Sequence, residues 1–306
     1  MINRYKVSDF DVVYISYDEP NAEKNWADLK SKCPWAKRVH GVKGFDAAHN
    51  KAGQISETDR VFTIDGDNTV REEFFDEQLE IDDETQKDYV FSWCGHNVIN
   101  GLAYGNGGVK LWPKHIITNM ESHEKATNEQ DAVDFCWMVT YFQMADTMSD
   151  VVVNGSPEQA FRAGVREGVK LSLDQGILPD KWEYLEKNHW KNLHRLAIWC
   201  SVGRDMPYGD WAILGARMST YMVNVERWDH TQIANYDFMQ PWCKEQLEKF
   251  DNVALRNEAI AEYGQLLRRD LQFRIADLDA DASRWFKMVY TNPKRFGIML
   301  TERDAK

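Results

Sequence analysis

The amino-terminal part of the chain alternates short apolar runs with amphipathic segments, and this order constrains the fold more than any other feature. Residues 11–17, 38–42 and 61–64 are short runs rich in apolar and β-branched side chains. Residues 21–32 and 45–57 lie between them and have the features of helices. Strands and helices that alternate through short links predict a doubly wound α/β unit, with a mixed sheet flanked by helices.

The run at residues 61–64 ends abruptly in Asp65-Gly66-Asp67-Asn68. Ligands of open α/β sheets gather beyond the carboxyl ends of strands, and a turn at Gly66 lets Asp65 and Asp67 face one ligand. Two carboxylates with open coordination positions suit Mn²⁺ or Mg²⁺ that holds a diphosphate. The alternative is an ordinary turn, because Asp, Gly and Asn are turn formers. The preceding strand and helix pattern favours the metal site.

The remainder of the chain predicts a mixed middle part and a helical end. Residues 72–88 are rich in Asp and Glu and predict a solvated connection, while residues 101–113 predict a glycine-rich loop entering a strand. Further strands are predicted at residues 89–94, 109–112 and 151–153. After Pro157, helical spacing of apolar residues covers 182–200, 208–225, 238–250 and 253–273. We therefore predict an α/β domain over residues 1–175 and a helical extension over residues 176–306 packed on it.

Charge and cysteine content narrow the class of protein. The formal net charge of −12 argues against a nucleic-acid binder that acts by overall charge, although it allows a local basic groove. The five cysteines are scattered without a Cys-x-x-Cys pair, so neither a zinc site nor a disulfide framework is indicated. No apolar signal core begins the chain, and no run has the length of a membrane span. We expect a cytoplasmic protein without a membrane partner.

The block FDAAHNKAG at residues 45–53, followed by residues 61–67, resembles the first half of the GT-A glycosyltransferases. In that superfamily a helix with small residues precedes a hydrophobic strand that ends in Asp-x-Asp. The strand that ends at Tyr17-Asp18-Glu19 is similar to the one that receives uracil and ribose. Residues 104–109 resemble the glycine-rich strand on the acceptor side, and residues 128–131 occupy the place of the acidic segment that carries the catalytic base. The resemblance covers residues 10–165.

The resemblance implies a UDP-sugar donor held by Mn²⁺ or Mg²⁺. Asp67 would bind the metal directly, and Asp65 would share the metal or hold the ribose. Asp131 would deprotonate the acceptor hydroxyl, with Glu129 as the alternative base. The structural alternative for Asp131 is that it caps a helix or lies on a helix surface. The other expected nucleotide-sugar residues are Tyr17, Asp18, Lys43, Gly44, His49, Lys51, Gly66 and Arg162. The three cations among them would contact the diphosphate or are ordinary surface charges. No His lies at residues 154–162, where a third metal ligand would be expected.

Residues 156–164 and 202–205 extend the resemblance to glycosyltransferases of large tailed bacteriophages, some of which modify hydroxymethylcytosine in DNA. That likeness implies a DNA acceptor. Arg162, Arg166 and Lys170 recur every four residues, so a helix would align them along one face. Such a stripe can track phosphates, and it is also common on solvated helix faces. The other expected acceptor residues are Gly107 and Gly108 in the glycine loop, with Trp93 and Trp112 to stack on a flipped base.

We therefore predict a metal-dependent GT-A glycosyltransferase that moves a glucose- or arabinose-type sugar from a UDP-sugar to hydroxymethylcytosine in phage DNA. The sequence leaves the sugar, the anomeric outcome and the oligomeric state open. A second hypothesis is the same chemistry on a saccharide or protein acceptor. A third is a non-catalytic protein that binds a nucleotide-sugar or nucleic acid, and the intact Asp65 and Asp67 argue against it.

Overall fold

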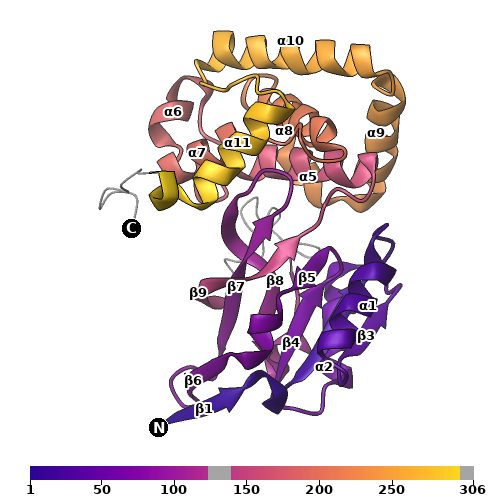
Figure 1. Ribbon diagram of the computed structural model, residues 1–306, viewed down its shortest axis with the longest axis vertical. Helices are drawn as coiled ribbons and strands as arrows, with labels where there is room; N and C mark the ends of the chain where they lie inside the picture. Colours follow the sequence, from indigo (N-terminus) through magenta and orange to yellow (C-terminus); the bar gives the residue numbers. More distant parts are fainter. Residues whose placement is uncertain (123–138, 297–306) are drawn as a thin grey trace. The chain divides into compact units, whose positions relative to one another are not determined.

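The computed structural model describes residues 1–122 and 139–296, and these form two compact units (Figure 1). The first unit contains residues 1–97 and 103–155. The second contains residues 98–102 together with the chain from residue 156 onward. The division after residue 155 places the start of the helical part twenty residues before the boundary predicted from sequence.

The first unit is built around a seven-stranded mixed sheet, so the predicted α/β class is confirmed. Its strands are β2 (Asp11–Ser16), β3 (Lys37–His40), β4 (Arg60–Asp65), β5 (Asn68–Val70), β7 (Tyr89–Asn97), β8 (Ala103–Pro113) and β9 (Thr140–Val151). Their order is β3-β2-β4-β8-β7-β9-β5. The parallel pairs are β2 with β3, β2 with β4, and β7 with β9, whereas β8 is antiparallel to both β4 and β7. The strands β2, β3, β4, β7 and β9 consequently run in one direction, and β5 is antiparallel to β9.

Helices pack on both faces of this sheet, as the alternation of strand residues requires. They are α1 (Ala22–Lys32), α2 (Phe45–Ile55) and the short α3 (Lys114–Ile117). Tyr14 of β2 and Leu29 of α1 belong to one buried apolar cluster, whereas Val13 of β2 and Ala52 of α2 belong to the other. Successive residues of a strand point to opposite faces, so β2 is buried on both sides and reads as a continuous apolar run.

Three local predictions for this unit are wrong. The acidic stretch at residues 72–88 is not merely a solvated connection, because it contains a 3-10 helix (Glu72–Asp76) and β6 (Gln78–Asp82). That strand pairs with β1 (Ile2–Lys6) in a two-stranded sheet, and its Leu79 and Ile81 are fully buried. The glycine-rich stretch predicted as a loop lies mostly within β8. Of the strand predicted at residues 151–153, only Val151 is in a strand, as the last residue of the longer β9.

The second unit is helical, as predicted for the chain after Pro157. Its helices are α5 (Pro157–Lys170), α6 (Tyr184–Lys187), α7 (Trp190–Trp199), α8 (Gly209–Asn224), α9 (Tyr236–Lys249), α10 (Val253–Leu271) and α11 (Ala280–Thr291). Ser156 caps α5 by accepting a hydrogen bond from the Gln159 amide at 3.1 Å. The helices α5 and α8 pack closely because their contact is made by glycines. A Cβ added at Gly164 would lie 2.0 Å from the Ala212 carbonyl oxygen.

Arg217 of α8 ties several segments of the second unit together. Its side chain is 1% exposed and donates to the carbonyl oxygens of Cys200, Ile260 and Ala276 at 2.7 to 2.9 Å. It also forms an ion pair with Asp277 at 2.7 Å. These acceptors follow α7, lie within α10, and lie in the segment before α11, so one buried guanidinium fixes three parts of the chain against α8.

Candidate functional site

The polar residues of interest in the first unit gather at one edge of the main sheet. Because β2, β3, β4, β7 and β9 run in one direction, their carboxyl ends meet at the same edge. The side chains at or just beyond these ends include Tyr17, Asp18, Glu19, Asp65, Asp67, His96 and Asp150. This is the edge at which open α/β sheets bind ligands, and we therefore consider it the candidate site.

Two hydrogen bonds to the backbone carbonyl of Gly66 hold this turn in place. Its carbonyl oxygen accepts a hydrogen bond from the Tyr14 hydroxyl at 2.6 Å and another from the Asn25 amide at 3.0 Å. In front of the turn lies the carboxylate of Glu19, whose Cδ atom would be only 2.7 Å from a Cβ at this position. A side chain at Gly66 would therefore require the Glu19 carboxylate to move, and this carboxylate also accepts a hydrogen bond from the Tyr17 amide.

Asp65 already has a cationic partner within the sheet. Its carboxylate lies 3.5 Å from Nζ of Lys110, a side chain of β8 that is 8% exposed. The neighbouring His49 of α2 is buried, its Nδ1 lies 3.0 Å from the Phe45 carbonyl oxygen, and burial lowers the pKa of its imidazole. His49 is therefore neutral at pH 7, and Lys110 is the cation that adjoins Asp65.

The side chain of Asn68 holds the carboxylate of Asp67 in place. Its carboxylate accepts a hydrogen bond from the Asn68 amide at 2.7 Å, and Asn68 in turn accepts one from the Ser149 hydroxyl at 2.8 Å. The backbone carbonyl of Asp67 also accepts from the Val152 amide at 2.7 Å. Gly108 makes room for this support, because a Cβ there would lie 2.2 Å from the Asn68 amide nitrogen.

A histidine at the same edge was missed by the sequence analysis. Nδ1 of His96, near the end of β7, lies 2.9 Å from the carboxylate of Asp150 on β9. The same carboxylate oxygen accepts from Arg71 at 2.8 Å, and Arg71 also donates to the Thr147 carbonyl at 3.1 Å. The hydrogen bond to His96 is the main cause that holds the pKa of Asp150 below its ordinary value. The available signal was a histidine and an aspartate that each end a strand.

The residues predicted to bind the nucleotide-sugar lie in the first unit, except for Arg162. Tyr17 and Asp18 are exposed beyond the end of β2, as expected for a ligand-facing position. Lys43 and Lys51 are exposed before and within α2, and Gly44 caps this helix with a φ of 99°, which favours glycine. Arg162 belongs to α5 of the second unit, where its guanidinium lies over the ring of Tyr236.

Three of the six residues predicted to bind the acceptor, Trp93, Gly108 and Trp112, are buried. Trp93 and Trp112 are both 0% exposed in the two apolar clusters of the first unit, so neither ring is accessible to a base in this structure. Gly107 packs against the backbone of β7, where a Cβ would lie 2.4 Å from the Gly95 nitrogen. Arg166 and Lys170 lie on α5, and Arg166 is exposed. Asp131 and Glu129 lie outside the described residues.

The oxygen donors at this edge fit a hard divalent cation that takes most of its ligands from phosphate and water. Asp67, Asp65 and Glu19 supply carboxylates at or beside one turn. Within residues 1–122 and 139–296, no group of three or more His, Cys, Asp or Glu side chains is arranged to hold a metal ion by itself. Asp65 is already paired with Lys110, whose Nζ lies 3.5 Å from its carboxylate.

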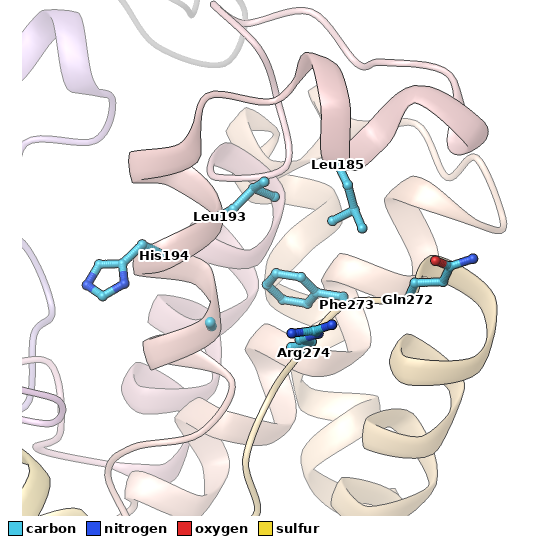
Figure 2. A pocket seen from close by; sticks show the side chains of 7 residues that line it. Leu185, Leu193, His194, Gln272, Phe273 and Arg274 are labelled. Carbon is cyan, nitrogen blue, oxygen red and sulfur yellow. The ribbon is translucent and has the colours of Figure 1, made fainter. Parts of the chain in front are cut away.

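The helical unit has a separate pocket of about 460 Å³. Leu185, Leu193 and Phe273 converge on it, while the imidazole of His194 points away from Phe273 (Figure 2). Arg274 supplies a cation at its rim, and Gln272 beside it has a φ of 54°. The pocket is open to solvent, and both apolar and polar side chains line it.

The first unit is therefore an α/β fold with a carboxylate-rich candidate site at the ends of its parallel strands. No protein family matches the chain, and no curated protein or solved structure is significantly similar to it. No helix in the described part of the chain combines the length and the apolar character that crossing a membrane requires.

Proposed function

We propose that the protein is a metal-dependent GT-A glycosyltransferase that uses a UDP-sugar donor. The observation that carries this proposal is the rigid turn Asp65-Gly66-Asp67 at the carboxyl end of β4, beside the end of β2. Both strands run parallel, so a nucleotide at the end of β2 would have its diphosphate beside the two carboxylates. The mixed sheet with helices on both faces is compatible with this fold but does not single it out.

The chain's own residues have distinct roles in this proposal. Asp67 binds the cation, and its support by Asn68 fixes the carboxylate before the ligand arrives. Tyr17 and Asp18 contact the nucleoside at the exposed end of β2. A bound Mn²⁺ or Mg²⁺ supplies electrostatic stabilisation of the leaving diphosphate. Lys110 adds a buried positive charge beside Asp65.

The first experiment is calorimetric titration of UDP into the protein with and without Mn²⁺. We expect metal-dependent binding that Asp67→Asn weakens at least about tenfold, or ~1.4 kcal/mol. Asp59→Asn is the matched control, because Asp59 is exposed and immediately precedes β4 at its opposite end. Equal UDP affinity in wild-type protein and Asp67→Asn, with the same metal dependence, would refute the assignment.

For the acceptor, we propose hydroxymethylcytosine in DNA. The support is the helix α5, on which Arg162, Arg166 and Lys170 lie at four-residue spacing. Replacing Arg166 and Lys170 by Gln is expected to weaken DNA binding and to reduce its log–log salt slope by ~0.9 for each lost phosphate contact. UDP affinity is the internal control and is expected to stay unchanged.

Product analysis separates this acceptor from the other hypotheses. The protein is incubated with UDP-glucose or UDP-arabinose, Mn²⁺ and DNA that contains hydroxymethylcytosine, and the nucleosides are examined by mass spectrometry. A nucleoside that gains one sugar supports the proposal. The absence of DNA binding at low salt would favour a saccharide or protein acceptor. Metal-dependent UDP binding without any donor turnover would favour a non-catalytic protein.

A further inference from the structure

Arg71 and Asp150 hold His96 in an orientation in which its imidazole can accept a proton. Asp150 receives Nδ1 of His96 at 2.9 Å and the Arg71 guanidinium at 2.8 Å on the same carboxylate oxygen. A carboxylate fixed in this way selects the imidazole tautomer with hydrogen on Nδ1, which leaves the lone pair on Nε2. Arg71 holds the carboxylate in place, because it also donates to the Thr147 carbonyl.

The other nitrogen of this histidine is open. The His96 side chain is 29% exposed, and Nε2 has no hydrogen-bond partner within residues 1–122 and 139–296. Here one nitrogen is held by a carboxylate, and the opposite one is available to a ligand.

The strand register places His96 at the same edge of the sheet as the proposed metal turn. His96 is paired with Asp150, which is paired with Thr69, so the three side chains lie on one face. Asp67 precedes Thr69 by two residues. Asp67 lies in the turn before β5, and the side chain of the next residue, Asn68, reaches β7 and β8. A Cβ at Gly95 would lie 3.6 Å from its Oδ1, and one at Gly108 would lie 2.2 Å from its Nδ2. Asn68 and Gly95, the neighbours of Asp67 and His96, therefore approach each other at this edge of the sheet.

We propose that His96 is the general base of the transfer reaction and that Asp150 is its positioning residue. This inference rests on the proposed function. In the step, the acceptor hydroxyl oxygen attacks the anomeric carbon of the donor, and the carbon–oxygen bond to the β-phosphate breaks. The electron pair of that bond leaves with UDP, and the hydroxyl proton moves to Nε2 of His96 and then to water. The residue given this role by sequence reasoning, Asp131, becomes the competing assignment.

The decisive variant is His96→Asn, because an asparagine amide can keep the hydrogen bond to Asp150 while it removes the basic nitrogen. The matched control is His115→Gln. His115 also pairs with an aspartate, Asp88, at 2.9 Å, but this pair lies at the opposite end of β7 and β8. Release of UDP from UDP-glucose is measured with Mn²⁺ and DNA that contains hydroxymethylcytosine. Affinity for UDP with Mn²⁺ is measured separately by calorimetry.

We expect His96→Asn to bind UDP and Mn²⁺ within about twofold of wild type and to release UDP about 10²–10⁴-fold more slowly. His115→Gln is expected to match wild type in both measurements. Asp150→Asn is expected to lower turnover with unchanged UDP affinity. In ¹⁵N spectra it should also shift His96 away from the Nδ1–H tautomer, a change that a merely structural role does not require.

Each other result overturns the assignment in a recognisable way. Wild-type turnover in His96→Asn refutes the base, and a dead Asp131→Asn beside it would give the role to Asp131. Loss of Mn²⁺ affinity in His96→Asn would make His96 a metal ligand instead. Wild-type protein that binds UDP with Mn²⁺ but never releases UDP from the donor refutes the catalytic role alone. If wild-type protein binds neither UDP nor Mn²⁺, the proposed function is refuted, and the assignment of His96 as its base is refuted with it.

Discussion

Replacing Arg217 by Met should destabilise the helical unit more than any change on its surface. The guanidinium is 1% exposed and is the donor for three carbonyl oxygens and one carboxylate. Methionine fills much of the same volume but donates no hydrogen bond. The Cys200 carbonyl, which follows α7, would then lose its buried donor, and the Ile260 carbonyl inside α10 would lose its side-chain donor.

The magnitude follows from which partners are buried. A buried polar group that loses its partner costs ~1–3 kcal/mol, and the packing of Met offsets part of this. The ion pair contributes little, because the Asp277 carboxylate is 55% exposed and its interaction is screened. We therefore expect Arg217→Met to lower the free energy of unfolding by ~3–5 kcal/mol. Asp277→Asn, which removes the charge and leaves the carbonyl bonds intact, should cost less than ~1 kcal/mol.

The assay is urea denaturation of the whole chain followed by far-ultraviolet circular dichroism and by tryptophan fluorescence. Two compact units allow two transitions, so the transition that carries most helical signal is the one to fit. Arg268→Gln is a second control, because Arg268 contacts the same Asp277 at 3.0 Å from a partly exposed position. Equal losses in Arg217→Met and Asp277→Asn would refute the reasoning, since the ion pair and not the carbonyl network would then dominate.

Three further predictions concern other contacts. Gly164→Ala should destabilise the helical unit by ~1–3 kcal/mol in thermal unfolding despite better helix propensity, because its Cβ would meet the Ala212 carbonyl at 2.0 Å; a stabilised variant would contradict this. Gly66→Ala should lower both stability and UDP affinity, and adding Glu19→Ala should restore part of the loss; strictly additive effects would show that the two groups do not collide. The pKa of Asp150 is lowered in the folded state, chiefly by its imidazole partner, so its stabilising contribution is present above the unfolded pKa and is lost as pH falls through the lower folded value. The difference in unfolding free energy between wild type and Asp150→Asn should therefore shrink as pH falls from neutral to acidic values. A difference that stays constant with pH would contradict this prediction.

The local elements of the first unit were predictable because their patterns lie within short stretches. The strand β2, the helices α1 and α2 and the strand β4 follow from apolar runs and helical spacing in consecutive residues, and all were confirmed within a few positions. The strands β1 and β6 were missed because each is stabilised by a partner far away in sequence, with Ile2 opposite Asp82. Much of β9 was missed, and its first half is largely exposed although it contains Tyr141, Phe142 and Met144.

The residues of the candidate site also differ in whether local sequence is enough to predict them. Asp65 and Asp67 were found because they directly follow a buried strand, and strand ends are readable from sequence. His96 and Asp150 are separated by 54 residues and meet only through the parallel pairing of β7 with β9. Lys110 was missed for a different reason. Its neighbours Val109 and Leu111 mark a buried strand, and a lysine there gives no sign of the carboxylate that it meets across the sheet.

Residues 98–102 belong to the second unit although β7 and β8, which flank them, belong to the first. Within the second unit, Lys287 of α11 is paired with the buried Asp205 at 2.7 Å and donates to the Ile99 carbonyl at 3.2 Å. The polypeptide therefore passes between the units at residues 97, 102 and 155. A protein cut after residue 155 would expose Ile99 and Leu102, which are otherwise buried, and would invite aggregation. Independent production of the sheet unit therefore calls for a short polar turn in place of these five residues, and the helical unit would then have to be supplied with them as a peptide.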